Sequence, residues 1–392
     1  MVKDPREVLP RAIAAIEQGI AEKLHLGAQV YVSLQGNPVA DFGIGEASPG
    51  VPMTSDKMLI WFSMTKAVTA VATAQMWEQG QFDLDDHVCH YIPEFGIKGK
   101  EAITIRHVLT HTGGFRDADG FLSGRFAGLP RSWEETIARI CDAGLEPDWI
   151  PGKKAGYHPT SGWFILGELV RRFDGRPFNR YVREVIFEPL GMLDSWVGMP
   201  SERYHEYGDR ITPMHAAVDG RLVPLVGLDT EDALTLCIPG ANGRGPIREF
   251  ARVFEMLLFR GLPSTAIQGQ REGARLLSPQ TVEAITARHR VGMFDETFQA
   301  VVDWGLGLIV DSINYGRHCS PRTFGHGGGQ SSVTFADPEQ CLVVALVVNG
   351  MPGPAAHYRR FEAITTAIYE DLGLVEPGSP GRDHVMPSRG SA

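Results

Sequence analysis

The chain has 392 residues, enough for a large hydrophobic core and, by length alone, for roughly two or three domains. Its hydrophobic content of 43% and charged content of 21% are ordinary for a globular protein in water. A formal net charge of −10, together with the absence of a long basic run, argues against nucleic acid as the main partner.

The amino terminus and the cysteines bear on the compartment in which the protein works. Residues 1–24 carry acidic side chains throughout and lack an uninterrupted apolar segment, so they predict an amphipathic helix rather than a signal peptide. The five cysteines are scattered and none forms a Cys-x-x-Cys pair, which argues against a disulfide framework or a zinc knuckle. Reduced thiols and a cytoplasmic location are therefore expected.

Two strands and a helix are predicted next. Residues 28–36 and 38–47 have the composition of two strands that meet in a turn at residues 36–38. The later run 58–77 carries a single charge, that of Lys66. Its length would suit a membrane span, but polar side chains interrupt it and a central lysine costs roughly 2.5–3.5 kcal/mol on insertion. Apolar positions at helical spacing instead predict a helix in a protein core, and no membrane partner is expected.

On this helix Ser63 and Lys66 stand three residues apart, so their side chains share one face. Ser63 falls near the helix start, where backbone N–H groups lack partners and favour developing negative charge. A lysine removed from water loses its proton more easily and can then take one from a neighbouring hydroxyl. The pair therefore has the arrangement that an acyl-transferring serine needs, although Ser-x-x-Lys also occurs by chance.

The rest of the chain predicts an α+β fold, in which helices flank one antiparallel sheet built from both chain ends. Helical segments and long loops occupy the middle, and strand patterns return at residues 304–313, 331–338 and 341–350 before a helix at 355–374.

The domain boundaries follow from this order. The sheet domain takes residues 1–90 and 300–375, and a mainly helical region takes residues 91–299. The tail 376–392 is rich in Pro, Gly and Ser and is expected to be flexible.

Two later stretches supply candidate partners for Ser63. Tyr157 lies in a loop before a helix that begins near Ser161, and His326 is followed by three glycines immediately before a strand. Consecutive glycines let backbone N–H groups approach a ligand closely, as an oxyanion hole requires. Each feature also has a plainer reading: a turn or bulge at a strand entrance for the glycines, a packing role for Tyr157, and a structural role for His326.

The order of these pieces resembles the serine β-lactamase and penicillin-binding-protein superfamily, with Ser63-Met64-Thr65-Lys66, then Tyr157, then His326-Gly327-Gly328. The likeness is greatest to class C β-lactamases, D-alanyl carboxypeptidases and family VIII carboxylesterases. The segments "TIRHVLTHTGGF", "FEPLGMLDSWV" and "RLLSPQTVEAI" also resemble segments of that family, and the likeness spans about residues 8–372.

The resemblance implies a β-lactamase/transpeptidase-like fold and a role for each residue. Ser63 would be the nucleophile, Lys66 would tune and relay protons, and Tyr157 would be the general base and acid. The backbone N–H groups of Ser63 and Gly329 would form the oxyanion hole, beside Gly328 in the substrate-binding strand. His326 would take the place of the usual lysine.

Two positions depart from the family pattern. Tyr-x-Asn becomes Tyr157-His158-Pro159, which removes an amide that would orient the substrate or the lysine. Lys-Thr-Gly becomes His326-Gly327-Gly328, which replaces a permanent charge with a titratable one. Both departures count against β-lactamase activity more than against acyl transfer itself.

A metal site is the competing interpretation of the histidines. His107 and His111 stand four residues apart, a spacing seen in zinc sites, and His87 and His90 lie nearby. No glutamate follows His107 to complete His-Glu-x-x-His, and the resemblance accounts for His111 as structural. No metal and no other cofactor is therefore expected.

The function expected from the sequence is hydrolysis of carboxylic esters through an acyl-enzyme on Ser63, with a small-molecule ester or amide as the substrate. An acyltransferase, an amide or β-lactam hydrolase, and an inactive binding protein on the same fold are the alternatives. The sequence leaves the oligomeric state open.

Overall fold

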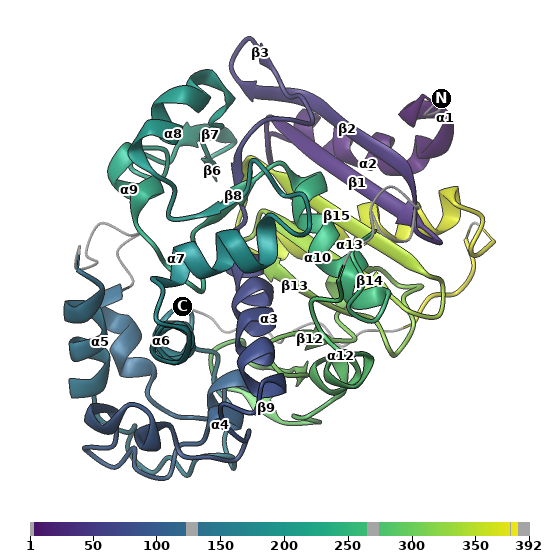
Figure 1. Ribbon diagram of the computed structural model, residues 1–392. Helices are drawn as coiled ribbons and strands as arrows, with labels where there is room; N and C mark the ends of the chain where they lie inside the picture. Colours follow the sequence, from purple (N-terminus) through teal and green to yellow (C-terminus); the bar gives the residue numbers. More distant parts are fainter. Residues whose placement is uncertain (1–3, 123–131, 265–273, 377, 383–392) are drawn as a thin grey trace.

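The computed structural model describes residues 4–122, 132–264, 274–376 and 378–382, and in it helices flank an antiparallel sheet (Figure 1). The fold is α+β, as predicted. The α-helices of these residues are α1 (Pro5–Val8), α2 (Pro10–Ala21), α3 (Thr65–Glu78), α4 (Ile105–Leu109), α5 (Trp133–Asp142), α6 (Ser161–Asp174), α7 (Phe178–Tyr181), α8 (Ser201–Tyr207), α9 (Glu231–Thr235), α10 (Ile247–Leu258), α12 (Pro279–Thr286) and α13 (Pro354–Asp371).

The main sheet is antiparallel throughout its described strands. In spatial order these are β11 (Asp303–Trp304), β12 (Ile309–Val310), β13 (Phe324–Gly328), β14 (Ser332–Asp337), β15 (Leu342–Val348), β1 (Gly27–Leu34), β2 (Asn37–Ser48) and β3 (Val51–Pro52). Shorter pairings involve β4 (Leu59–Ile60), β5 (Trp196–Val197), β6 (His215–Val218), β7 (Arg221–Pro224), β8 (Gly243–Gly245), β9 (Phe294–Asp295), β10 (Ala300–Val301) and β16 (Gly350–Met351).

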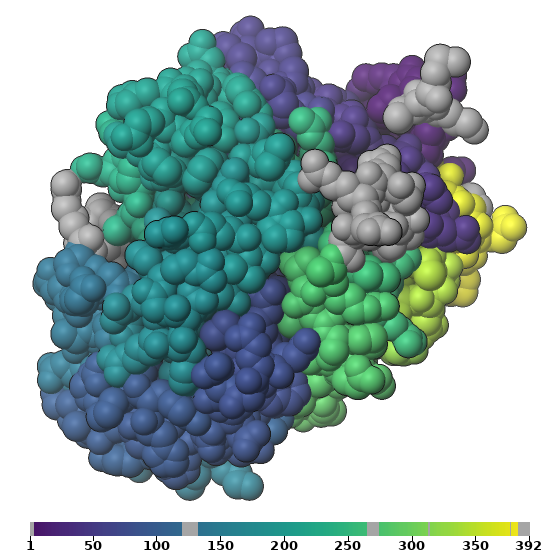
Figure 2. Space-filling model, viewed as in Figure 1, coloured from purple at the N-terminus to yellow at the C-terminus, as the bar shows by residue number. Residues whose placement is uncertain are grey.

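The two ends of the chain meet in the middle of this sheet. β1 pairs with β15 from Ala28 opposite Val348 to Leu34 opposite Leu342. In the space-filling view the purple N-terminal residues and the yellow C-terminal residues lie on the same side of the molecule (Figure 2). The prediction that both chain ends build the sheet is therefore confirmed.

Strand β15 is buried on both faces, which explains its uninterrupted apolar sequence. Successive side chains of a strand point to opposite faces, so alternate residues enter two different cores. Those facing α2 and α13 are Leu342, Val344, Leu346 and Val348. Those facing α3 and α10 are Val343, Ala345 and Val347.

Helix α3 lies in the second of these cores and is buried on all sides from Thr65 to Met76. A helix with small and apolar residues all round can be enclosed in this way, and only a few polar side chains then need partners. Thr69 Oγ1 donates a 2.5 Å hydrogen bond to Pro239 O, and Gly243 N donates a 2.8 Å bond to Thr65 Oγ1. The segment 239–243 thus runs along α3, where Lys66 also lies.

Local details differ from the sequence predictions where proline or glycine acts on the backbone. The amino-terminal helix is broken at Leu9, because the residue before Pro10 is kept out of the helical conformation. The hairpin turn uses Gln35 and Gly36, both with positive φ. The predicted strand 304–313 is instead a short hairpin of β11 and β12.

The regions assigned to separate domains make contacts across their predicted boundaries. α10, from the region 91–299, packs on β1, β14 and β15. Arg382, within the tail predicted for 376–392, forms an ion pair with Asp311, and residues 383–392 lie outside the described residues. The domain division itself stays a prediction.

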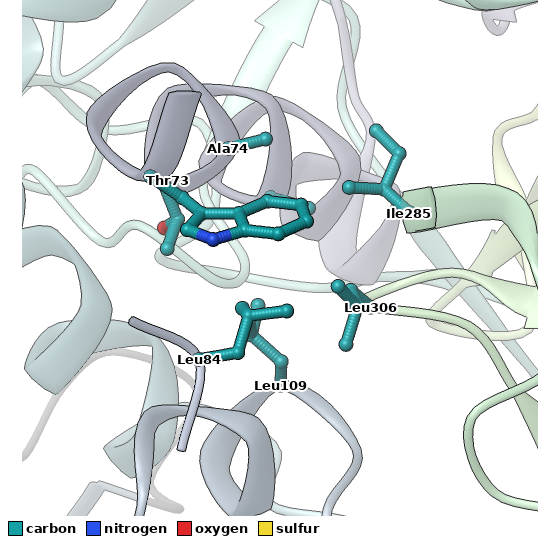
Figure 3. Close-up of a pocket in the computed structure, with 8 residues that line it drawn as sticks. Thr73, Ala74, Leu84, Leu109, Ile285 and Leu306 are labelled. Atoms are coloured by element: carbon teal, nitrogen blue, oxygen red, sulfur yellow. The ribbon is translucent and has the colours of Figure 1, made fainter. Parts of the chain in front are cut away.

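A small cavity lies beside α3, beyond the turn that carries Lys66 (Figure 3). Thr73 and Ala74 of α3 point into it opposite Leu84, Leu109 and Ile285. Its volume of about 10 Å³ leaves room for one water at most, so it is a packing defect and not a substrate site. No helix in the described part of the chain is long and apolar enough to cross a membrane.

Candidate active site

Ser63 sits where the chain enters α3. Residues Phe62–Met64 form a 3-10 turn that leads directly into the helix, and Lys66 follows in its first turn. The Lys66 Nζ atom lies 3.1 Å from Ser63 Oγ. Phe62, immediately before the serine, has φ +49°, a conformation that is strained for a bulky side chain and is often found at functional sites.

Lys66 is fully buried and is held by two backbone carbonyls. Its Nζ atom donates a 2.7 Å hydrogen bond to Pro159 O and a 2.6 Å bond to Gly240 O. Burial lowers the pKa of Lys66 well below its ordinary value, and the carboxylate of Asp119 raises it in part. Pro159, which stands where the resembled family has an asparagine, thus contributes a backbone carbonyl to Lys66.

Tyr157 completes the contacts of the serine. Its hydroxyl donates a 2.8 Å hydrogen bond to Ser63 Oγ, and its backbone N–H donates a 3.1 Å bond to Asp295 Oδ1. The ring packs against Phe298, with 4.6 Å between ring centroids. Burial raises the pKa of Tyr157, so the phenol keeps its proton. The loop position before α6 is as predicted.

His326 lies inside strand β13 rather than before a strand. Its register partner is Thr334 of β14, and alternation places its side chain on the same sheet face as Phe324 and Gly328. The Nδ1 atom is 2.6 Å from Gly327 O, so this nitrogen carries the ring proton. Burial, and then the charge of Lys66, lowers the pKa of His326 to about 3. The ring is therefore neutral near pH 7.

The glycines after His326 allow strand β13 to approach the serine closely. A Cβ on Gly328 would collide with Trp61 O and would lie 3.2 Å from Ser63 N. Gly329 has φ +50° and packs on the ring of Phe62. The structure thus brings Ser63, Lys66, Tyr157 and the end of β13 together.

Three contributors to the site were not identified from the sequence. The carbonyls of Pro159 and Gly240 carry no side-chain signal, because any residue has a carbonyl. Asp119 caps α6 by accepting hydrogen bonds from the backbone N–H groups of Thr160 and Ser161, at 2.9 and 2.7 Å. A capping carboxylate more than 40 residues from its helix gives no local pattern to recognise.

The histidines considered as metal ligands have other contacts. His107 Nδ1 accepts a hydrogen bond from Thr104 N and so caps α4. His111 lies beyond the end of α4, where its Nδ1 accepts a bond from His158 N and its ring packs 4.7 Å from that of Tyr157. Within the residues that the structure describes, no group of three or more His, Cys, Asp or Glu side chains is placed to hold a metal ion.

Comparison with known proteins assigns the fold to a family. A family model described as Beta-lactamase matches residues 12–367. The chain belongs to the beta-lactamase family. The resemblance drawn from the motifs is thereby confirmed. Because the chain belongs to this family and its relatives include proteins named esterases, it is a serine hydrolase.

Individual relatives are distant but cover nearly the whole chain. The esterase/beta-lactamase LipL of Mycobacterium tuberculosis is 27% identical over 390 residues, which cover 90% of this chain and 83% of LipL. The esterase EstB of Burkholderia gladioli is 26% identical over 386 residues, covering 90% of this chain and 94% of EstB. The crystal structure of a family VIII carboxylesterase has a TM-score of 0.74 at 24% identity, covering 93% and 97% of the two chains, and so shares the fold.

Proposed function

We propose that this protein hydrolyses carboxylic esters of small molecules through an acyl-enzyme formed on Ser63. The observation that carries the proposal is the convergence of two proton-carrying groups on one hydroxyl. Lys66 Nζ lies 3.1 Å and the Tyr157 hydroxyl oxygen 2.8 Å from Ser63 Oγ. The esterase names of LipL and EstB support the same choice of substrate class.

Lys66 is the general base in this proposal. A neutral amine has two N–H bonds and one lone pair, and the two carbonyls of Pro159 and Gly240 take both N–H bonds. The lone pair then faces Ser63 Oγ, and burial favours the neutral amine by lowering the pKa of Lys66. As Ser63 Oγ attacks the ester carbonyl, its proton passes to Lys66 Nζ.

Tyr157 is the general acid in this proposal, whereas the motif resemblance gives it both proton-transfer roles. Its raised pKa keeps the phenol protonated, and its hydroxyl donates to Ser63 Oγ. The phenol gives its proton to the departing alkoxide and regains one from Lys66, so the products of this half-reaction are an alcohol and the acyl-Ser63 ester. Water then attacks that ester by the reverse transfers, which releases the carboxylic acid.

The negative charge of each tetrahedral intermediate needs hydrogen-bond donors. The backbone N–H groups of Ser63 and Gly329 are proposed to supply them. The proposal is supported by the close packing of Gly328 against Ser63 N and of Gly329 against Phe62.

Esters without a carboxylate are proposed to be better substrates than β-lactam antibiotics. Such antibiotics carry a carboxylate that a lysine helps to hold in relatives, whereas His326 is buried and neutral here. Losing a charge-assisted contact of about 1.5–3 kcal/mol weakens binding roughly ten- to hundredfold. Penicillins and cephalosporins should therefore turn over slowly or not at all, and His326→Lys should shift the preference towards them.

Covalent labelling tests the nucleophile. A fluorophosphonate probe should add one adduct to the wild-type protein, located on Ser63 by mass spectrometry. Ser63→Ala should lose the label, and its turnover of p-nitrophenyl acetate and butyrate should fall by several orders of magnitude. Ser48→Ala, on β2 away from the site, is the matched control and should keep both.

Two results would count against this function. Near-normal ester hydrolysis by a folded Ser63→Ala protein would remove Ser63 from the mechanism. A wild-type enzyme that hydrolysed cephalosporins faster than simple esters would contradict the proposed ester preference.

A further inference from the structure

The turn between β13 and β14 carries the N–H group proposed for the oxyanion hole. Gly329 and Gln330 both have positive φ, +50° and +58°, and Ser331 N donates a 2.8 Å hydrogen bond to Gly328 O. This geometry is that of a tight β-turn with Gly329 and Gln330 as its two central residues, and its tightness fixes the direction of each peptide group in it. A rotation of the turn would redirect the Gly329 N–H.

The turn also lies directly against the nucleophile. A Cβ on Gly328 would lie 3.2 Å from Ser63 N, so the absence of a side chain there lets the strand pack against the Ser63 backbone, and a Cβ on Gly329 would likewise collide with the Phe62 ring. Displacement of a reacting group by about 1 Å can cost a hundredfold in rate. Whatever holds this turn from the opposite side therefore matters to the reaction.

Arg360, on α13, holds the turn from that side. It is 5% exposed. Its Nη2 atom donates a 2.7 Å hydrogen bond to Gln330 O and a second 2.7 Å bond to Gly350 O. Its Nη1 atom donates a 2.9 Å bond to Leu24 O. One planar guanidinium thus joins the turn, β16 and the segment that leads into β1.

The charge of Arg360 is expensive for the fold. Among the residues that the structure describes, no carboxylate lies within salt-bridge distance of it, and burial lowers its pKa to about 9. Apolar side chains in such positions are often better for stability than buried charges. Several inward positions of α13 are apolar, among them Phe361, Ile364 and Ile368, and the polar side chains buried beside them, His357 and Thr365, carry no permanent charge. Stability alone therefore gives a poor account of an arginine here.

We infer that Arg360 is a positioning residue for ester hydrolysis, acting through Gln330 O to set the direction of the Gly329 N–H in the oxyanion hole. This inference rests on the proposed function. A lysine could make only some of the same contacts, because its ammonium is a point donor without the planar fork.

The test compares an ester with its thionoester, in which sulfur replaces the carbonyl oxygen. Sulfur is a weaker acceptor than oxygen, so a thionoester gains less from an oxyanion hole. In Arg360→Met the kcat/KM for the ester should fall by about 10- to 100-fold, less than the 10²–10³ found when a donor is removed outright. The kcat/KM for the thionoester should fall by less than about threefold, so the preference for oxygen shrinks, mainly through kcat.

Three further proteins make the comparison decisive. Arg359→Met makes the same change at the exposed neighbour of Arg360 and should leave both rates unchanged. Arg360→Lys keeps the charge and should retain part of the ester rate and of the oxygen preference. If Arg360→Met fails to fold, the ester and thionoester rates of Arg360→Lys are compared with those of the wild type instead. Wild-type enzyme, titrated with the fluorophosphonate probe, gives the reference rates per active site.

The possible outcomes distinguish a failure of the role inferred for Arg360 from a failure of the proposed esterase function. Equal losses with ester and thionoester would show general damage to the site and overturn the role of Arg360. An unchanged ester rate in both Arg360 variants would overturn it too. A wild-type protein that neither labels at Ser63 nor hydrolyses esters would instead overturn the proposed function.

Discussion

Lys66 is acted on by two influences that shift its pKa in opposite directions. Burial lowers this pKa, and the carboxylate of Asp119 raises it. Because the proposed base is the neutral amine, the active fraction grows as the pH rises through the pKa of Lys66. Asp119 is therefore expected to set the lower end of the working pH range, although it does not touch Ser63.

Asp119→Asn should move the acid limb of the kcat/KM–pH profile to lower pH. Removing the carboxylate takes away the influence that raises the pKa of Lys66, while an amide oxygen can still accept from Thr160 N and Ser161 N. Asp117→Asn, at an exposed position of the same turn, is the control and should leave the limb in place. An acid limb that stayed where it is in both variants would mean that the limb does not report Lys66.

Tyr157→Phe should reduce turnover by about 10²–10⁴, the usual effect of losing a general acid. The ring and its packing on Phe298 remain, so circular dichroism and thermal unfolding should change little. Tyr181→Phe is the matched control, because its buried hydroxyl donates to Gln75 and not to the site. Full activity in Tyr157→Phe would leave protonation of the leaving group to Lys66 alone.

At the scale of elements, the N-terminal end of α3 belongs to the candidate active site, whereas the rest of the helix packs in the core. The end that carries Ser63 and Lys66 meets β13, while the cavity between Thr73 and Leu84 lies further along the helix. The packing beyond Lys66 is thus separable from the chemistry, and changes there should alter stability without altering turnover.

Leu84→Ala should lower the free energy of unfolding by about 2–5 kcal/mol, because it enlarges a cavity that already exists. Urea unfolding followed by fluorescence measures this loss, and kcat/KM per titrated site should stay near the wild-type value. Leu193→Ala, at a side chain that is 61% exposed, should change stability by no more than about 0.5 kcal/mol. A similar loss in both variants would argue against the cavity as the cause.

An element could be predicted from the sequence where its pattern of residues is contiguous in the chain. The apolar run of β15 and the charge-poor run of α3 are contiguous, so both elements could be predicted, the strand within two residues of its observed bounds. His326 was placed outside a strand because its glycine neighbours have low strand propensity. The strand forms there since its partner β14 and the close approach to Ser63 decide the conformation.

At the scale of the whole molecule, the residues of the site could likewise be predicted only where a local sequence motif contains them. Ser63, Lys66 and Tyr157 could be predicted because their side chains have chemistry that a motif records. The partners of Lys66 are carbonyls, and Arg360 acts on a turn whose residues lie 30 positions earlier in the chain. Such contacts exist only after folding has brought distant segments together, so no local pattern announces them.

A chain that ends at residue 320 should yield no soluble, active protein. It lacks β13, β14, β15 and α13, and so leaves one edge of β1 without a strand partner and α2 without the helix it packs on. Each buried valine or leucine of β15 contributes roughly 1.5–3 kcal/mol, against a total stability of about 5–15 kcal/mol for a typical domain. Fluorophosphonate labelling of the soluble fraction measures the outcome, and a chain that ends at residue 382 is the control. A soluble 320-residue protein that hydrolyses esters would contradict this account.

The pairing of β1 with β15 also sets the order of events on the ribosome. More than 300 residues separate these strands, which at 5–20 residues per second is roughly 15–60 s of synthesis. During that interval the β1–β2 hairpin has left the ribosome with the edge of β1 that pairs with β15 still without its partner. Nascent chains are then open to aggregation and to chaperone binding. Slower growth at low temperature, or added chaperone, should therefore raise the yield of this protein by protecting the β1–β2 hairpin until β15 has been made.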